Sequence, residues 1–204
     1  IVKALAMIRA GEIGTPLQME ANFNQDKFLG MSQDNWRFEE RNAPAGPLTA
    51  TGIHLIDLAV AVFGRAKAVT AALGRFSGEL RNGDTLGVLV EFAEGGHALI
   101  SAILATPFSG RFAVYGSSGW IDIRDNAHPE NPHGWTMRIA RRGAAEESIS
   151  FSSHPSVRDN LEAFAASILN GAIYPIPSDE LADNVAILEA VVQSTRSGLR
   201  VSLA

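Results

Sequence analysis

The hydrophobic and polar positions along the chain change their period several times, and each change marks a predicted element. Residues 1–10 have apolar side chains at helical spacing, and residues 17–23 alternate apolar and polar side chains as a half-buried strand does. A second helix is predicted over 47–63, and two more begin near Ser156 and Ser178, which we expect to be N-caps. The remaining strands are predicted at 66–73, 85–92, 98–105, 111–115, 120–123, 135–140, 148–151 and 199–203.

The order of these elements predicts an α+β fold. Consecutive strands joined by short turns pair antiparallel, and the helices then cover one face of an open, mainly antiparallel sheet. Two apolar stripes are expected to face the core, one on each of the last two helices: Leu161, Phe164, Ala165 and Ile168, then Leu181, Val185, Leu188 and Val192. The second face of strands 85–92 and 98–105 is mostly uncharged, so we expect it to form a homo-dimer or homo-tetramer interface.

Composition narrows the functional classes. A chain of 204 residues suits one domain, and a net charge of -5 without a Lys or Arg run argues against a nucleic-acid partner. There are no cysteines, and no apolar stretch reaches the roughly 18 residues that a membrane span needs. These features favour a cytoplasmic protein without a membrane partner. Because the chain begins Ile1-Val2-Lys3, without an initiator Met, we expect it to start inside a longer protein.

The helix predicted over 47–63 holds the main candidate for chemistry. Its only ionisable residues are His54 and Asp57, and their apolar surroundings predict burial. Thr51, His54 and Asp57 are spaced three apart and so share one helix face, while Gly52 suggests close approach of a backbone or ligand. His54 is therefore a candidate proton-transfer group or hydrogen-bond donor to substrate. The alternative is an interior histidine whose nitrogens are satisfied by Asp57 and a backbone carbonyl.

A long polar loop over 24–47 precedes that helix and contains Trp36 and Arg37. These two residues either line a substrate pocket, or Trp36 anchors the loop while Arg37 stays in solvent. The other histidines are weaker candidates: His97 is expected at a solvated sheet edge, His128 and His133 in a flexible tip, and His154 in a loop before a helix. No metal-ligand spacing and no dinucleotide-binding glycine loop occurs, so neither metal-binding nor cofactor-binding residues are expected in this chain.

Three stretches resemble the C-terminal domain of the glucose-fructose oxidoreductase, inositol dehydrogenase and rhizopine-catabolism (Gfo/Idh/MocA) family. They are residues 11–16 (GEIGTP), residues 46–57 (GPLTATGIHLID), and the helices that contain residues 160–164 and 186–190. The second stretch is similar to the family pattern Gly-Gly-x-Leu-x-Asp-x-Gly-x-His-x-x-Asp. The resemblance covers nearly the whole chain in order.

The resemblance implies a substrate-binding and oligomerisation domain over residues 1–204 that binds substrate on its helix side. It also implies an upstream Rossmann domain, absent from this chain, which binds NAD or NADP and carries a catalytic lysine in a Glu-Lys-Pro motif. His54 matches the family histidine that assists proton transfer at the oxidised hydroxyl. The family aspartate four residues earlier is Ala50 here, which indicates either a substitute partner, Thr49 or Thr51, or a different substrate such as a cyclic diol.

The sequence thus predicts the C-terminal part of an NAD(P)-dependent oxidoreductase that acts on a CH–OH group of a sugar, polyol or cyclic diol. His54 is the candidate catalytic residue, and Trp36, Arg37, Thr51 and Asp57 are candidate substrate-binding residues. We expect no cofactor on this fragment alone, which by itself would be inactive. Two alternatives remain open: a non-catalytic oligomerisation or ligand-sensing domain, and a metal-dependent hydrolase or lyase that uses His54 and Asp57.

Overall fold

A computed structural model describes residues 1–203, in which nine strands form one open sheet in the order β8-β7-β6-β5-β1-β4-β3-β2-β9. Strands β1 and β4 pair parallel, and all the other neighbouring strands pair antiparallel. The predicted α+β class with a mainly antiparallel sheet is therefore confirmed. The strands are β1 (Pro16–Asn24), β2 (Ala66–Gly74), β3 (Thr85–Phe92), β4 (His97–Ile103), β5 (Ser109–Gly116), β6 (Gly119–Asp125), β7 (Trp135–Arg141), β8 (Glu147–Phe151) and β9 (Val201–Ser202).

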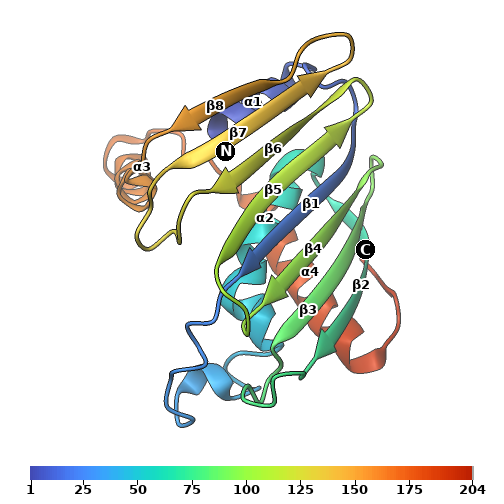
Figure 1. Ribbon diagram of the computed structural model, residues 1–204, viewed down its shortest axis with the longest axis vertical. Helices are drawn as coiled ribbons and strands as arrows, with labels where there is room; N and C mark the ends of the chain where they lie inside the picture. The colour runs from blue at the N-terminus through green and yellow to red at the C-terminus, as the bar shows by residue number, and fades with distance from the viewer. Residues whose placement is uncertain (204) are drawn as a thin grey trace.

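Helices gather on one face of this sheet (Figure 1). They are α1 (Val2–Arg9), a 3-10 turn (Trp36–Phe38), a π-helical turn (Leu48–Gly52), α2 (Ile53–Phe63), α3 (Ser156–Asn170) and α4 (Ser178–Ser197). Helix α4 packs on β2, and α2 packs between α4 and the central strands β1 and β4. Among the described residues, no helix is both long enough and apolar enough to cross a membrane.

The core lies between these helices and the sheet. Met19, Ile56, Val69, Val90 and Ile187 are almost completely shielded from solvent and come from β1, α2, β2, β3 and α4. Burying a side chain of this size stabilises the fold by about 1.5–3 kcal/mol. A second, smaller cluster of Phe38, Leu80 and Leu104 attaches the loop after β1 to the end of the sheet.

The two C-terminal helices differ from the sequence prediction. Ser156 and Ser178 are the first helical residues and not N-caps; Pro155 and Pro177 hold the N-cap positions. No residue of α3 is buried, so its stripe does not face the core as predicted. On α4 the buried residues are Ile187, Ala190, Val191 and Ser194, because the helix contacts the sheet through its second half. The predicted core positions Leu188 and Val192 are partly buried there, whereas Leu181 and Val185 remain exposed.

His97 was also placed wrongly by the sequence prediction. It lies in β4, which pairs with β1 on one side and β3 on the other, so it is not at a sheet edge. Its Nε2 atom lies 2.8 Å from Oε1 of Gln18 on β1. Gly95 and Gly96 before it form the turn that joins β3 to β4, and both of these strands lie inside the sheet.

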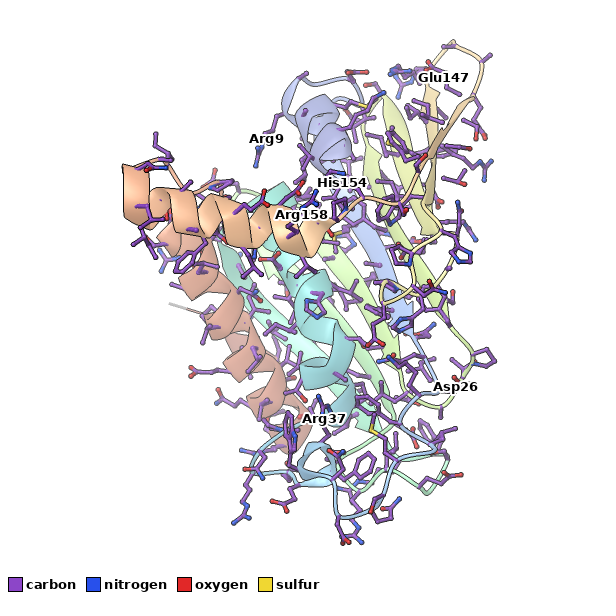
Figure 2. The ribbon with its side chains drawn as sticks, turned by 90° about the vertical axis from the view of Figure 1, so that its left-hand side faces the viewer. Arg9, Asp26, Arg37, Glu147, His154 and Arg158 are labelled. Carbon is purple, nitrogen blue, oxygen red and sulfur yellow. The ribbon has the colours of Figure 1, made fainter. Side chains whose placement is uncertain are left out.

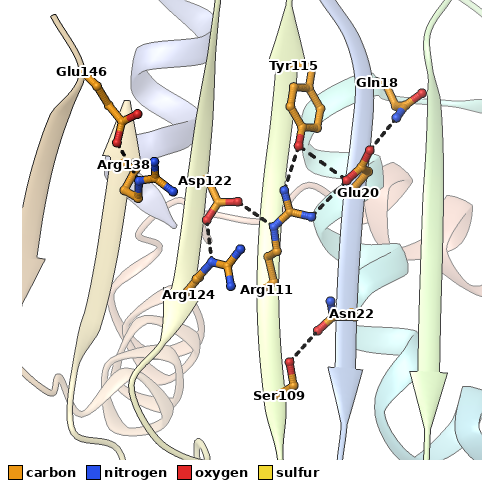
Figure 3. Close-up of polar contacts among 10 residues, drawn as sticks. All are labelled: Gln18, Glu20, Asn22, Ser109, Arg111, Tyr115, Asp122, Arg124, Arg138 and Glu146. Atoms are coloured by element: carbon orange, nitrogen blue, oxygen red, sulfur yellow. Dashed lines mark hydrogen bonds and ion pairs between the residues drawn. The ribbon is translucent and has the colours of Figure 1, made fainter. Parts of the chain in front are cut away.

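The face of the sheet opposite the helices divides into two halves. Over β3 and β4 it is uncharged, apart from Glu91 and His97 at one end, as the sequence predicts, and Leu99 is partly exposed there. Over β1, β5 and β6 it is charged: Arg111 donates to Asp122 at 2.6 Å and to Glu20 at 3.0 Å, and Arg124 donates to Asp122 at 3.1 Å (Figure 3). The uncharged second face was predicted for β3 and β4 only and is confirmed there, and the neighbouring half over β1, β5 and β6 is charged.

Asp84 holds the connection between β2 and β3. Its carboxylate is fully buried and accepts hydrogen bonds from the backbone N–H groups of Phe76 and Ser77 at 3.1 and 2.7 Å. The hydroxyls of Ser77 and Thr85 also donate to it, at 2.7 and 2.8 Å. Burial alone would raise the pKa of Asp84, but these hydrogen bonds to the charged form outweigh burial and lower it.

We expect Asp84→Asn to lower the free energy of unfolding by about 2–3 kcal/mol at pH 7, because buried donors lose a charged acceptor. A carboxyl whose folded pKa is lowered stabilises the fold above the unfolded value of about 3.9 and loses that contribution as the pH falls through the folded pKa. The difference between the two proteins should therefore shrink below about pH 4. Urea unfolding from pH 3 to 7 measures it, with Asp34→Asn in an exposed loop as control. An equal loss in both variants would contradict this role.

Candidate active site on helix α2

Helix α2 presents His54 away from the core. Its buried residues, Leu55, Ile56, Ala59, Val60 and Phe63, occupy one side of the helix. At about 100° per residue, His54 lies on the opposite side, and it is exposed in this domain. The predicted burial of His54 is therefore wrong, because a uniformly apolar helix does not reveal which of its faces a neighbour covers. The imidazole faces open space on the helix side of the sheet.

The segment before His54 forms a π-helical turn, whereas the sequence predicts a regular helix from residue 47. The N–H of Ile53 donates to the carbonyl of Leu48, five residues earlier. Thr51 is buried, and its hydroxyl lies within hydrogen-bond distance of two carbonyls, those of Phe23 at 3.1 Å and Pro47 at 3.3 Å. Single π turns inside helices occur frequently at functional sites. Here the turn fixes Thr51 to the end of β1, so the Thr51 side chain supports the backbone.

Gly52 lies inside this turn. A Cβ atom at this position would be 3.3 Å from the Pro47 carbonyl oxygen and 3.7 Å from Leu86 on β3. The structure thus gives a backbone reason for glycine, as the sequence suggested. It allows the turn to sit close against the sheet.

Asp57 is half-buried and lies within electrostatic reach of His54. Burial raises the pKa of Asp57 above its ordinary value, and the charge of His54 offsets part of that effect. Functional sites often contain a carboxyl group whose charged form is disfavoured by desolvation and which lies near an imidazole. Asp57 therefore places a carboxyl group within electrostatic range of the His54 ring.

Trp36 and Arg37 lie together in the 3-10 turn, with the Arg37 guanidinium 4.5 Å from the centre of the Trp36 ring. Phe38, and not Trp36, anchors the loop, because Phe38 is buried while Trp36 is 52% exposed. With Thr49 and Ala50, the pair borders a hollow of about 40 Å³. Ligand sites usually measure roughly 300 Å³ or more, so this hollow alone is too small for a sugar.

Asn82 holds this loop in place, although in the sequence Asn82-Gly83 is only a turn signal. Its buried side-chain amide donates to the carbonyls of Arg37 and Ala43, both at 2.7 Å. The partners are 45 and 39 residues away in sequence. An Asn-Gly turn signal gives no indication of such distant partners.

His128 is better anchored than the predicted flexible tip would suggest. Its Nε2 atom lies 2.9 Å from Oε1 of buried Gln25, and its Nδ1 atom accepts the N–H of Glu130 at 3.2 Å. Its ring also contacts Phe23 and Phe108 edge to face. Burial lowers the pKa of His128, and nearby Lys27 adds to that effect. This cluster at the end of β1 was missed because its partners are distant in sequence.

The metal-dependent alternative gains no support from the geometry. Within residues 1–203, no group of three or more His, Asp or Glu side chains is arranged to hold a metal ion. His54 and Asp57 therefore lack a third ligand among the described residues.

Comparison with known proteins defines the class. The family model described as the GFO/IDH/MocA C-terminal domain matches residues 1–122. The uncharacterized oxidoreductase YdgJ of Escherichia coli is 24% identical over 97% of this chain and 61% of its own length. A proposed NADPH-dependent oxidoreductase from Desulfitobacterium hafniense has a TM-score of 0.87 at 26% identity, covering 98% of this chain and 60% of the other. Levoglucosan dehydrogenase, solved with NADH and levoglucosan, shares the fold with a TM-score of 0.77 at 20% identity, covering 98% of this chain and 61% of the other.

The domain is thus of the type that the matching family model describes as a C-terminal domain. The chain belongs to the GFO/IDH/MocA family, as its resemblance indicated. It spans about 60% of the length of the relatives it matches.

The raised pKa of Asp57 leads to a stability prediction. A carboxyl whose folded pKa is raised destabilises the fold once it ionises, so stability falls as the pH rises from the ordinary value of about 3.9 through the folded pKa. We expect Asp57→Asn to be more stable than the parent protein at pH 7 and equally stable near pH 3. Thermal unfolding at both pH values measures this, with Asp26→Asn at an exposed carboxylate as control. A destabilised Asp57→Asn at pH 7 would show that the carboxylate instead holds structure together.

Proposed function

We propose that the full-length protein is an NAD(P)-dependent oxidoreductase that acts on a secondary alcohol of a sugar, polyol or cyclic diol. Residues 1–204 would supply the substrate-binding and oligomerisation domain. The observation that carries this proposal is His54, which a member of an oxidoreductase family presents on the open side of α2. The structural neighbour solved with NADH and a sugar derivative supports the cofactor and substrate class.

The described residues do not fit a dinucleotide. They contain no glycine-rich turn between a strand and a helix that would hold a pyrophosphate, so we assign the dinucleotide to the part of the protein outside this chain. A nicotinamide cofactor held there would supply the hydride-accepting chemistry for oxidation of the alcohol carbon. The domain of residues 1–204 would then have two tasks, which are to position the alcohol and to move its hydroxyl proton.

His54 would accept the hydroxyl proton as the alcohol becomes a ketone. Asp57 would stabilise the imidazolium that forms, because the two side chains interact electrostatically. Trp36 and Arg37 would meet only the edge of the substrate, because their hollow is small. Thr51 would act through the backbone, since its hydroxyl is directed to the carbonyls of Phe23 or Pro47.

A non-catalytic oligomerisation or ligand-sensing domain is the second candidate, and Ala50 favours it. Ala50 packs beside the cluster of Phe38, Leu80 and Leu104, in the position of the family aspartate. A member without that carboxylate has lost one of the groups expected to share the proton.

His54→Ala in the full-length enzyme separates the two candidates. If His54 moves the proton, turnover should fall by about 10²- to 10⁴-fold while the cofactor dissociation constant stays unchanged. Steady-state rates with a panel of sugars, polyols and cyclic diols, together with NADH and NADPH titrations, measure both quantities. His133→Ala, at an exposed histidine in another loop, is the matched control. Unchanged turnover in His54→Ala, or no turnover with any substrate in the parent protein, would favour the non-catalytic candidate.

We also propose that the uncharged half of the open face forms the interface of a homo-dimer or homo-tetramer. Leu99 is exposed there and borders an open depression of about 840 Å³, which covers β2, β3 and β4 and extends to Glu20 on β1 and Arg111 on β5. Leu99→Lys should therefore reduce the mass of the full-length assembly, because a charge would be buried in the interface. Light scattering measures the mass, and Ser150→Lys on the outer strand β8 is the control. The same assembly mass in Leu99→Lys would exclude this face.

A further inference from the structure

Helix α3 carries an apolar stripe that contacts no core. Val157, Leu161, Phe164 and Ile168, here called the α3 stripe, follow a spacing of four, three and four residues and share one side of the helix. They are between 53% and 75% exposed, and no residue of α3 is buried. The helix projects on the same side of the sheet as α2 and α4 (Figure 2). The ring of Phe164 contacts Tyr174 edge to face, but this contact leaves every residue of α3 unburied. A 15-residue helix with so little packing is only marginally stable in water, so the α3 stripe requires a partner.

The open face of α2, like the α3 stripe, is mainly apolar. Apart from His54 and Asp57, it shows only apolar residues, among them Leu58 and Ala61, which are half-buried. Helix faces that remain in water normally carry Lys, Glu or other charged residues. Two helices on one side of the sheet thus present apolar surface for the same kind of partner.

We infer that the α3 stripe docks the nucleotide-binding domain that precedes this domain in the full-length polypeptide. The inference rests on the proposed function for the existence of that domain. The matching family model describes a C-terminal domain, and about 40% of each matched relative lies outside the matched region. An upstream domain of that size is therefore the available occupant.

The position of the α3 stripe favours this occupant over a second copy of the chain. Docking on the helix side would also cover the open face of α2, so one partner would account for both apolar surfaces. It would place that domain on the side of the sheet on which His54 is exposed. A second copy has the opposite face of the sheet available, where Leu99 is exposed. The α3 stripe would thus set the spacing of the two domains without contacting substrate or cofactor.

The test uses Leu161→Asp in the full-length protein, with Leu169→Asp as a matched control. Leu169 lies on the same helix and is 79% exposed, at the flank of the α3 stripe, about 110° around the helix from its middle. A carboxylate in the last turn of a helix is less favourable than one in the first half, so the control disturbs the helix at least as much. Hydrogen exchange of residues 156–170 and thermal unfolding with and without saturating NADH are the two measurements.

In the parent protein and in Leu169→Asp, the amides of residues 156–170 should be protected from hydrogen exchange. Both proteins should unfold in a single thermal transition, and NADH should raise its midpoint temperature. In Leu161→Asp, hydrogen exchange of this segment should be about tenfold faster or more. Two thermal unfolding transitions should appear, and NADH should raise the midpoint temperature of only one of them. The NADH dissociation constant should stay within about twofold, because the change lies outside the cofactor site. Leu161→Asn repeats the test with a smaller change.

Two results would overturn the inference. The first is unchanged exchange protection and a single NADH-sensitive unfolding transition in both Leu161 variants. The second is a smaller assembly mass with that single transition intact, which would identify a second copy of the chain as the occupant. If the parent protein binds neither NADH nor NADPH, the proposed function fails separately. Protection of residues 156–170 in the full-length chain, and its loss in the Leu161 variants alone, would then still decide whether the α3 stripe is docked.

Discussion

The parallel pairing of β1 with β4 is the constraint on which the rest of the structure depends. Two parallel neighbours cannot be joined by a tight turn, so the chain must leave β1, cross the sheet and return. It does so through the loop after β1, the π turn and α2, before β2 and β3 lead back to β4. The hydrogen bond from the Thr51 hydroxyl to the Phe23 carbonyl ties the start of α2 to the end of β1. The position of His54 at the start of α2 therefore depends on this crossover and on its attachment to β1.

Much of this fold can be predicted from the sequence, because strands and helices impose different periods on the apolar positions. The strand over Thr85–Phe92 was predicted to the residue, and the order of elements sufficed for the α+β class. The family resemblance likewise followed from residues 46–57 and was confirmed by the match to the family model. Local patterns of this kind are determined by neighbours within a few positions.

The errors arise where a distant partner decides the outcome. Periodicity identified the apolar side of α3 but placed it in the core, although nothing in residues 1–203 buries it. The apolar composition of α2 suggested a buried His54, yet only half of the helix is covered. His128 and Asn82 make their contacts with residues about 40 to 100 positions away, so their roles were missed. The sequence reports which surfaces are apolar more reliably than it reports what covers them.

Asp57 shows how a helix face that the domain leaves uncovered bears on function. A half-buried carboxylate whose pKa is raised by desolvation does not stabilise the domain, so selection for stability alone does not explain it. On a helix face that the domain leaves open, its effect on a neighbouring imidazole grows as the surroundings lose water, because charges interact more strongly at low dielectric. A partner that closes over α2 would therefore strengthen the electrostatic coupling of Asp57 to His54. The apolar surface that surrounds the pair and the charge interaction within it thus have one common requirement, which is the exclusion of water by a second domain.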